Sequence, residues 1–164
     1  MSSRIDFDEP IPQLIERLKS EHRSFESKIV EIQGSINDNN IAHATKIIRS
    51  MIDKVTHHAV EEEARLMRVI MQKAKNESPE SIRIMQEHNW VMNFFKSELR
   101  AIENRQNFKI DSQTQGDDYV DKNEQSKKEL NEFVMNLRSH FSDEEQIVFP
   151  LALSRSIMIL LIFK

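Results

Sequence analysis

Histidine and glutamate recur with the same spacing in two distant parts of the sequence. His58 precedes Glu62 by four residues and His140 precedes Glu144 by four, and the pairs are offset by 82 residues (140 − 58 and 144 − 62). Residues four apart in a helix lie on one face, about one turn from each other. Both side chains of a pair can therefore reach one buried site. Such a site would suit a metal ion, because a buried carboxylate is costly unless it is paired or coordinated.

Two further histidines stand in apolar stripes of helical spacing. His22 fills the slot between Leu18 and Phe25, and His88 occupies the equivalent place in a later stripe. Taken singly, each would be read as a core histidine, and a single His-x-x-x-Glu as a surface pair; their coincidence favours a metal site. The predicted metal ligands are His22, His58, Glu62, His88, His140 and Glu144.

Four imidazoles and two carboxylates, without a thiolate, suit iron, zinc or manganese. Carboxylates near the axis of a helical bundle can each bridge two ions, and imidazoles can then cap the ions. Bridging carboxylates with positions left open favour redox-active iron over structural zinc. We therefore expect two non-haem iron ions.

Other histidines and carboxylates lie near these positions in the sequence. His57 and Glu26 remain open as additional ligands, whereas His43 is excluded because it lies about 22 Å along the helix from His58. The remaining neighbours, Glu61, Glu63 and Glu145, are expected to face solvent.

The composition predicts an all-α fold. Two Gly and four Pro in 164 residues leave few turns, so we expect few, long elements. Pro10 and Pro12 open the first helix, and Gly34 with residues 37–40 ends it. Later helices are predicted at about residues 41–75, 79–105 and 121–150, with 107–122 as the longest connection. Mostly short connections favour an up-down-up-down four-helix bundle.

A single domain is expected, with residues 1–10 as an N-terminal arm, 11–152 as the bundle and 153–164 as an apolar C-terminal tail. Pro150 is expected to kink or end the last helix. The tail has seven consecutive apolar residues (157–163), far fewer than the roughly 20 that span a bilayer. We expect it to dock on the bundle or on a partner chain, with weak membrane association as the alternative.

Charge and cysteine content narrow the class of protein. The formal net charge of −4 does not favour nucleic-acid binding. The absence of cysteine excludes disulfides, thiolate metal sites and cysteine nucleophiles. It fits a reducing cytoplasm, and the polar N-terminus does not resemble a signal peptide. A cytoplasmic location is therefore expected.

Around these residues the chain resembles the hemerythrin-like family, also called the HHE cation-binding domain. The resemblance runs from about Ile11 to Leu151 and is most specific from His140 to Glu145 and on to Pro150. It implies a non-haem di-iron centre in a four-helix bundle, with one His from each of the first and third helices. The second and fourth helices would each supply a His and a bridging Glu, namely His58 with Glu62 and His140 with Glu144.

One position departs from the oxygen carriers of this family, which place two histidines four apart on the third helix. Here the residues four before and after His88 are Ile84 and Met92. The site therefore resembles the symmetric bacterial and archaeal version. This difference favours sensing, peroxide or nitric oxide chemistry, or iron handling over reversible O2 carriage.

The leading interpretation is a di-iron protein that binds O2 or a related small ligand, nitric oxide or peroxide, for sensing, storage or iron and oxidative-stress handling. The imidazoles would pair as His22 with His58 and His88 with His140. An apolar wall would exclude water: Phe25, Phe95, Leu137, Phe141 and Val148. The alternatives are a di-iron enzyme with peroxidase-like or nitric-oxide-reducing activity, or a structural metal-bound bundle whose tail meets a protein partner.

Overall fold

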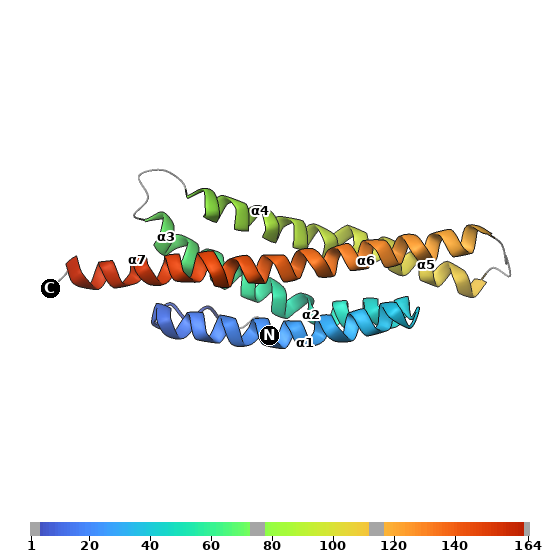
Figure 1. Cartoon of the computed structure of the whole chain (residues 1–164), viewed down its shortest axis with the longest axis horizontal. Helices are drawn as coiled ribbons and strands as arrows, with labels where there is room; N and C mark the ends of the chain where they lie inside the picture. The colour runs from blue at the N-terminus through green and yellow to red at the C-terminus, as the bar shows by residue number, and fades with distance from the viewer. Residues whose placement is uncertain (1–3, 73–77, 112–116, 163–164) are drawn as a thin grey trace.

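The computed structural model describes residues 4–72, 78–111 and 117–162, and the side chains of 4–72, 78–107 and 122–157. Residues 4–10 precede the first helix, the other described residues are helical or lie in turns between helices, and none of them forms a strand, as the composition predicted. Four long helical segments lie alongside one another, roughly parallel to the long axis of the molecule (Figure 1).

The first segment is a regular helix, and each of the other three contains a π-helical turn. The first is α1 (Ile11–Asn37). The second comprises α2 (Ile41–Glu61), the π turn η1 (Glu62–Met67) and α3 (Arg68–Met71). The third comprises α4 (Pro79–Asn93), η2 (Phe94–Glu98) and α5 (Leu99–Asp111). The fourth comprises α6 (Asp117–Asp143), η3 (Glu144–Val148) and α7 (Phe149–Ile162).

The helix starts follow from local chemistry. Pro10 occupies the N-cap of α1, and the side chain of Ser78 accepts a hydrogen bond from the backbone N–H of Ser81 at 3.4 Å. Asn40 caps α2 in the same way. Satisfying the free N–H groups of a first turn stabilises the helix end. These starts agree with the proline and N-cap positions in the sequence.

The end of α1 differs from the prediction that Gly34 contributes to it. The helix continues through Gly34 to Asn37, and a side chain at residue 34 would meet nothing within 4 Å. The left-handed residue of the turn is Asn39, with φ 60°. Asparagine tolerates this region better than most residues, so it replaces glycine as the turn residue.

The predicted connection over residues 107–122 was too long. Helix α5 continues to Asp111 and α6 begins at Asp117. Polar residues such as Lys, Gln and Glu are good helix formers, so polarity alone did not mark a loop. Pro150 does not end the last helix either, because α7 continues to Ile162. It is the second residue after a π turn, in which the α-helical hydrogen-bond pattern is already altered.

The apolar core is divided into two clusters. The larger cluster includes Phe25, Val55, Val91, Phe133 and Leu137, and the smaller cluster includes Leu18, Leu66, Ile84, Val148 and Phe149. In each of the four segments, the predicted His and Glu ligands lie where the chain passes from one cluster to the other. The fold therefore presents these polar side chains as a layer between two apolar regions.

The π turns change which apolar residues face the core. If the apolar stripes of the second and fourth segments continued with uninterrupted α-helical spacing past Glu62 and Glu144, Val69 and Leu151 would lie in the core. Instead, the buried residues are Met67 at the end of η1, Ile70 after it, and Phe149 and Ala152 after η3. A π turn holds one more residue than an α turn, so later side chains are shifted by one position.

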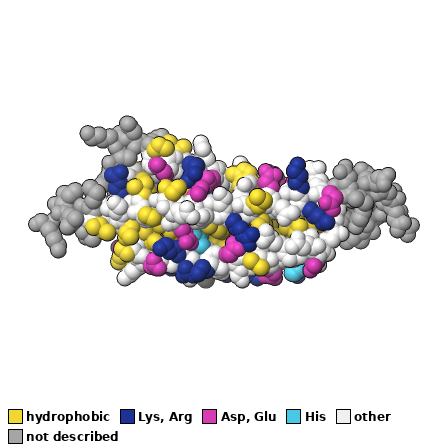
Figure 2. All heavy atoms as spheres, viewed as in Figure 1, with side chains coloured by type: hydrophobic (Ala, Val, Ile, Leu, Met, Phe, Trp, Pro, Cys, Tyr) yellow, Lys and Arg dark blue, Asp and Glu magenta, His cyan; other side chains and the backbone are white. Residues whose placement is uncertain are grey.

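Over the described part of the face shown in Figure 2, acidic and basic side chains are interspersed with hydrophobic ones. Among the described residues, none of the helices combines the length and apolar character that crossing a membrane requires.

Candidate metal centre

All six predicted ligands are brought together in the layer between the apolar clusters. Their exposed fractions are 0% for both glutamates and 1–5% for the four histidines. They form two groups, each with ligand atoms within 4.8 Å of one another: His22, His58, Glu62 and Glu144, and Glu62, His88, His140 and Glu144. Two imidazoles thus belong to each group, and both carboxylates are shared.

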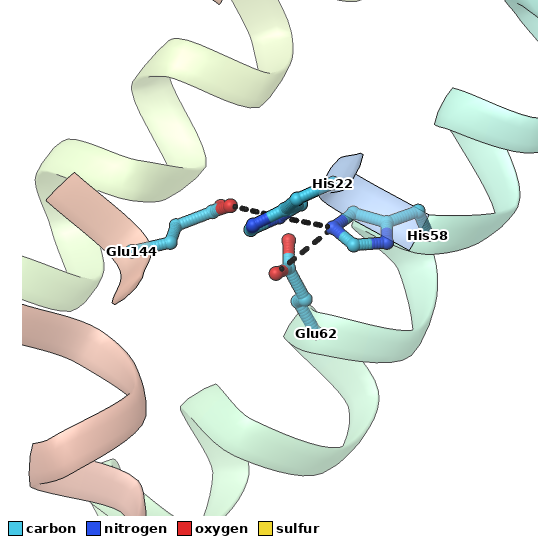
Figure 3. A group of neighbouring side chains, drawn as sticks. All are labelled: His22, His58, Glu62 and Glu144. Carbon is cyan, nitrogen blue, oxygen red and sulfur yellow. Dashed lines mark hydrogen bonds and ion pairs between the residues drawn. The ribbon is translucent and has the colours of Figure 1, made fainter. Parts of the chain in front are cut away.

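In the first group, the Nε2 atoms of two imidazoles lie next to each other (Figure 3). His22 Nε2 lies 2.9 Å from His58 Nε2 and 3.1 Å from Glu144 Oε2. His58 Nε2 lies 3.2 Å from Glu62 Oε1. Two nitrogens each about 2.1 Å from one ion, at adjacent corners of an octahedron, would be about 3 Å apart. The spacing of the imidazoles therefore suits a shared cation.

The second group repeats this arrangement around the other oxygens of the carboxylates. His88 Nε2 lies 3.2 Å from Glu62 Oε2 and 3.3 Å from Glu144 Oε1. His140 Nε2 lies 2.9 Å from Glu144 Oε1. Each carboxylate thus has one oxygen toward each pair of imidazoles, which is the arrangement that bridging two ions requires.

The other nitrogen of every imidazole is bonded to a second carboxylate. The pairs are His22 with Glu145 (2.8 Å), His58 with Glu21 (2.7 Å), His88 with Glu63 (2.9 Å) and His140 with Glu87 (2.7 Å). An ionised carboxylate only accepts hydrogen bonds, so Nδ1–H must donate. Each bond therefore fixes the tautomer and aims Nε2 at the centre of the layer.

These outer carboxylates, Glu21, Glu63, Glu87 and Glu145, are directly adjacent in sequence to one of the six central residues. Glu63 and Glu145 do face solvent, with side chains 39% and 40% exposed, but each also accepts a hydrogen bond from an imidazole, which the sequence did not predict. A signal was available, since Glu-His and Glu-Glu pairs recur in both halves of the chain. Neighbouring helical residues point about 100° apart, so each outer Glu reaches the imidazole of an adjacent helix.

Glu61 was also expected to face solvent, and it is 3% exposed. Arg17 explains its burial, because its guanidinium donates to both oxygens of Glu61 at 2.8 and 2.9 Å. Arg17 also donates to Glu21 at 3.0 Å and to Glu9 at 2.8 Å. Arginine thereby links the N-terminal residues to the carboxylate that orients His58.

The candidates for additional ligands lie outside both groups. Glu26 is bonded to Arg138 at 2.9 Å, and its side chain is 46% exposed. His57 Nε2 lies 3.6 Å from Glu61 Oε2. His43, which the sequence excluded, is exposed near the start of α2.

Aromatic rings cover one side of the centre. Phe141 stacks on His22 with a centroid distance of 4.4 Å, and Phe25 meets His58 edge-on at 5.4 Å. Phe149, which the sequence analysis missed because η3 shifts the core face, stacks on His22 at 5.5 Å. Phe95 instead packs against Phe133 in the larger cluster.

The electrostatics favour positive charge between the glutamates. Burial alone would lower the pKa of His58, but Glu62 and Glu21 outweigh it and raise that pKa to about 10. Burial is likewise outweighed at His88, whose pKa rises to about 10, and at His140, whose pKa rises to about 9. Burial raises the pKa of Glu144, but His140 and the neighbouring imidazoles hold it well below its usual range.

Three buried carboxylate oxygens nevertheless lack a well-aligned hydrogen bond among the described residues, although imidazole nitrogens lie 3.1–3.2 Å from them: Glu62 Oε1, Glu62 Oε2 and Glu144 Oε2. Leaving a buried acceptor unsatisfied costs about 1–3 kcal/mol, and more when it is charged. Nitrogen and carboxylate donors around these oxygens fit a transition metal. The cluster can therefore hold metal ions.

A pH dependence follows from these pKa values. His58, His88 and His140 are protonated in the metal-free protein at neutral pH, because their pKa values of about 9–10 exceed the ordinary 6.5. Their charged forms stabilise the metal-free fold fully below pH 6.5, and this contribution is lost as the pH rises through about 9–10.

Metal uptake near neutral pH must displace these protons, so we expect the release of about three protons per chain and tighter binding at higher pH. Calorimetric titrations in buffers of different ionisation enthalpy measure the release directly. Uptake without proton release would contradict the assignment of these imidazoles as ligands.

We compared the chain with known proteins, and no family model, no curated protein and no solved structure matches it.

Proposed function

We propose that the protein is a non-haem di-iron protein that binds O2 or a related small ligand, nitric oxide or peroxide, for sensing, storage or iron and oxidative-stress handling. The observation that carries this proposal is the sharing of Glu62 and Glu144 between two imidazole pairs. Iron bound there would supply redox chemistry and open coordination positions for the small ligand.

In this proposal His22 and His58 hold one ion, His88 and His140 hold the other, and Glu62 and Glu144 bridge them. The set has nitrogen and oxygen donors only, which suits iron as well as zinc or manganese. The six residues offer fewer donor atoms than two six-coordinate ions need, so some coordination positions would stay open. Open positions favour redox-active iron over structural zinc.

The surrounding residues would orient the ligands and exclude water. The outer carboxylates fix all four imidazoles, and such partners typically contribute 10–100-fold, as an order of magnitude, to metal affinity. Phe141 and Phe149 cover His22 with stacked rings. Their apolar surface would keep bulk water from the first group.

We also propose the up-down-up-down bundle of the hemerythrin-like family. The order of the apolar clusters along the chain supports it. In α1 the smaller cluster precedes the larger, as Leu18 and Phe25 show, and in the second segment the larger precedes the smaller, as Val55 and Leu66 show. The order alternates again in the third and fourth segments. The cytoplasmic location predicted from the sequence stays a prediction.

Metal analysis of protein purified without air tests the function. We expect about two iron ions per chain, with an absorption band in the visible range that appears when oxygen is admitted. Zinc in place of iron, or no metal and no colour, would contradict the proposal and favour a structural centre. Catalytic turnover of added peroxide or nitric oxide would instead identify an enzyme.

A further inference from the structure

A recess of about 230 Å³ opens on the surface beside the second group of ligands. The residues that line it are Glu87, Trp90, Val91, Asn136, Ser139 and His140. They come from α4 and α6, and Asn136 and Ser139 are exposed at the surface. The recess therefore connects solvent with one of the four central imidazoles.

The inner wall of the recess is continuous with the metal centre. Glu87 accepts a hydrogen bond from His140 Nδ1 at 2.7 Å, and its side chain is 30% exposed. On the far side of the same ring, His140 Nε2 lies 2.9 Å from Glu144. One imidazole thus separates the recess from the bridging carboxylate.

At three of the corresponding positions the first half carries larger side chains, whereas Ser24 takes the place of Trp90. Offsets of 66 residues (88 − 22) and 82 residues (140 − 58) relate the halves. By these offsets, Phe25 is equivalent to Val91, Lys54 to Asn136 and His57 to Ser139. A lysine and a histidine thus replace the two smaller residues at the mouth of the recess.

An arginine also holds the outer glutamate more closely in the first half than in the second. Arg17 precedes Glu21 by four residues and bonds to it at 3.0 Å, and it is tied as well to Glu9 and Glu61. Arg83 has the same position relative to Glu87, yet it lies 3.9 Å away. Glu87 is therefore held less tightly than Glu21, on the side where the recess opens.

We propose that this recess is the route by which a small neutral molecule reaches the His88–His140 half of the centre, so that the two halves are functionally unequal. The inference rests on the proposed function and adds to it the side of access and the class of ligand. Trp90 and Val91 offer apolar surface to a neutral molecule, and the carboxylate of Glu87 disfavours an anion by like-charge repulsion.

The test copies two side chains of the first half to the mouth of the recess. In the double variant Asn136→Lys with Ser139→His, the side chains of Lys54 and His57 are reproduced at the recess. The matched control makes the same two types of change on exposed residues of α6 outside the recess, Asn131→Lys with Ser142→His. Circular dichroism establishes that both variants are folded.

The first readout needs no metal. Trp90 is the only tryptophan of the chain and lines the recess, so tryptophan fluorescence comes from a residue of the recess wall. We expect quenching of the metal-free protein by acrylamide, a small neutral molecule, to fall about twofold in the recess variant, because the longer side chains cover the indole. Quenching in the control variant should equal that of the unmodified protein.

The second readout is the association rate of nitric oxide with the iron-loaded protein, measured by stopped-flow absorption without air. We expect it to fall about tenfold in the recess variant with unchanged iron content, since binding then requires side-chain movement. Equal rates in all three proteins would overturn the route, even if quenching had fallen. A protein that takes up no iron would instead overturn the proposed function and the route with it, and metal analysis distinguishes the two failures.

Discussion

The Glu62→Gln variant is expected to lose metal from both halves of the centre. Glu62 directs one oxygen to His58 at 3.2 Å and the other to His88 at 3.2 Å. Glutamine has nearly the same volume, but it offers one neutral oxygen and an amide group that cannot bind a cation. Because each ion would lose a charged ligand, we expect the iron content to fall from about two per chain to near zero.

Metal analysis with circular dichroism measures this effect in a folded protein. The matched control is Glu63→Gln, at the next residue, whose carboxylate bonds to His88 Nδ1 at 2.9 Å and does not belong to either ligand group. That change should weaken metal binding by about 10–100-fold and leave a loaded centre at high iron concentration. Full iron content in folded Glu62→Gln would show that Glu62 is not a bridging ligand.

The Phe133→Ala variant is expected to have the largest effect on stability. Phe133 is 1% exposed, stacks on Phe94 with a centroid distance of 4.0 Å and contacts Trp90 at 5.9 Å. Truncation would leave a cavity in the larger apolar cluster. We expect the free energy of unfolding to fall by about 3–5 kcal/mol.

Urea unfolding of the metal-free protein measures this change without a contribution from bound ions. The exposed residue Met135, at 68%, provides a control, and Met135→Ala should change the free energy by less than about 0.5 kcal/mol. A similar small loss for Phe133→Ala would mean that the larger cluster does not carry the stability of the fold.

The sequence was most informative where a polar residue interrupts an apolar stripe of helical spacing. His22, His58, His88 and His140 each stand in an apolar stripe, and all four are buried in one layer. A polar residue at a core position is costly without a partner, so its presence indicates one. The same reasoning placed Glu62 and Glu144, which the structure brings to the same layer.

The contacts that the sequence did not predict depend on the relative rotation of neighbouring helices. Glu63 and Glu145 reach His88 and His22 across helix boundaries, and periodicity within one helix carries no information about such contacts. Arg17 contacts Glu61 across 44 residues for the same reason. These residues looked like ordinary solvated charges because their partners are distant in the sequence.

The apolar periodicity also failed to predict which residues are buried after Glu62 and Glu144. Glu62 and Glu144 are the first residues of π turns, which add a residue without any marker such as glycine or proline. Uninterrupted α-helical spacing would bury Val69 and Leu151, whereas the structure buries Ile70 and Ala152. π turns occur frequently at functional sites, and these two begin at the residues of highest chemical interest.

This extra residue limits how the chain can change in length during evolution. Deleting one residue from η1 or η3 would restore regular α-helical spacing and would rotate every later side chain of that helix by about 100°. Met67 and Phe149, both nearly fully buried, would then turn away from the core. Single-residue gaps at these two positions should therefore be absent from working relatives, whereas substitutions at the exposed positions of the same turns should be common.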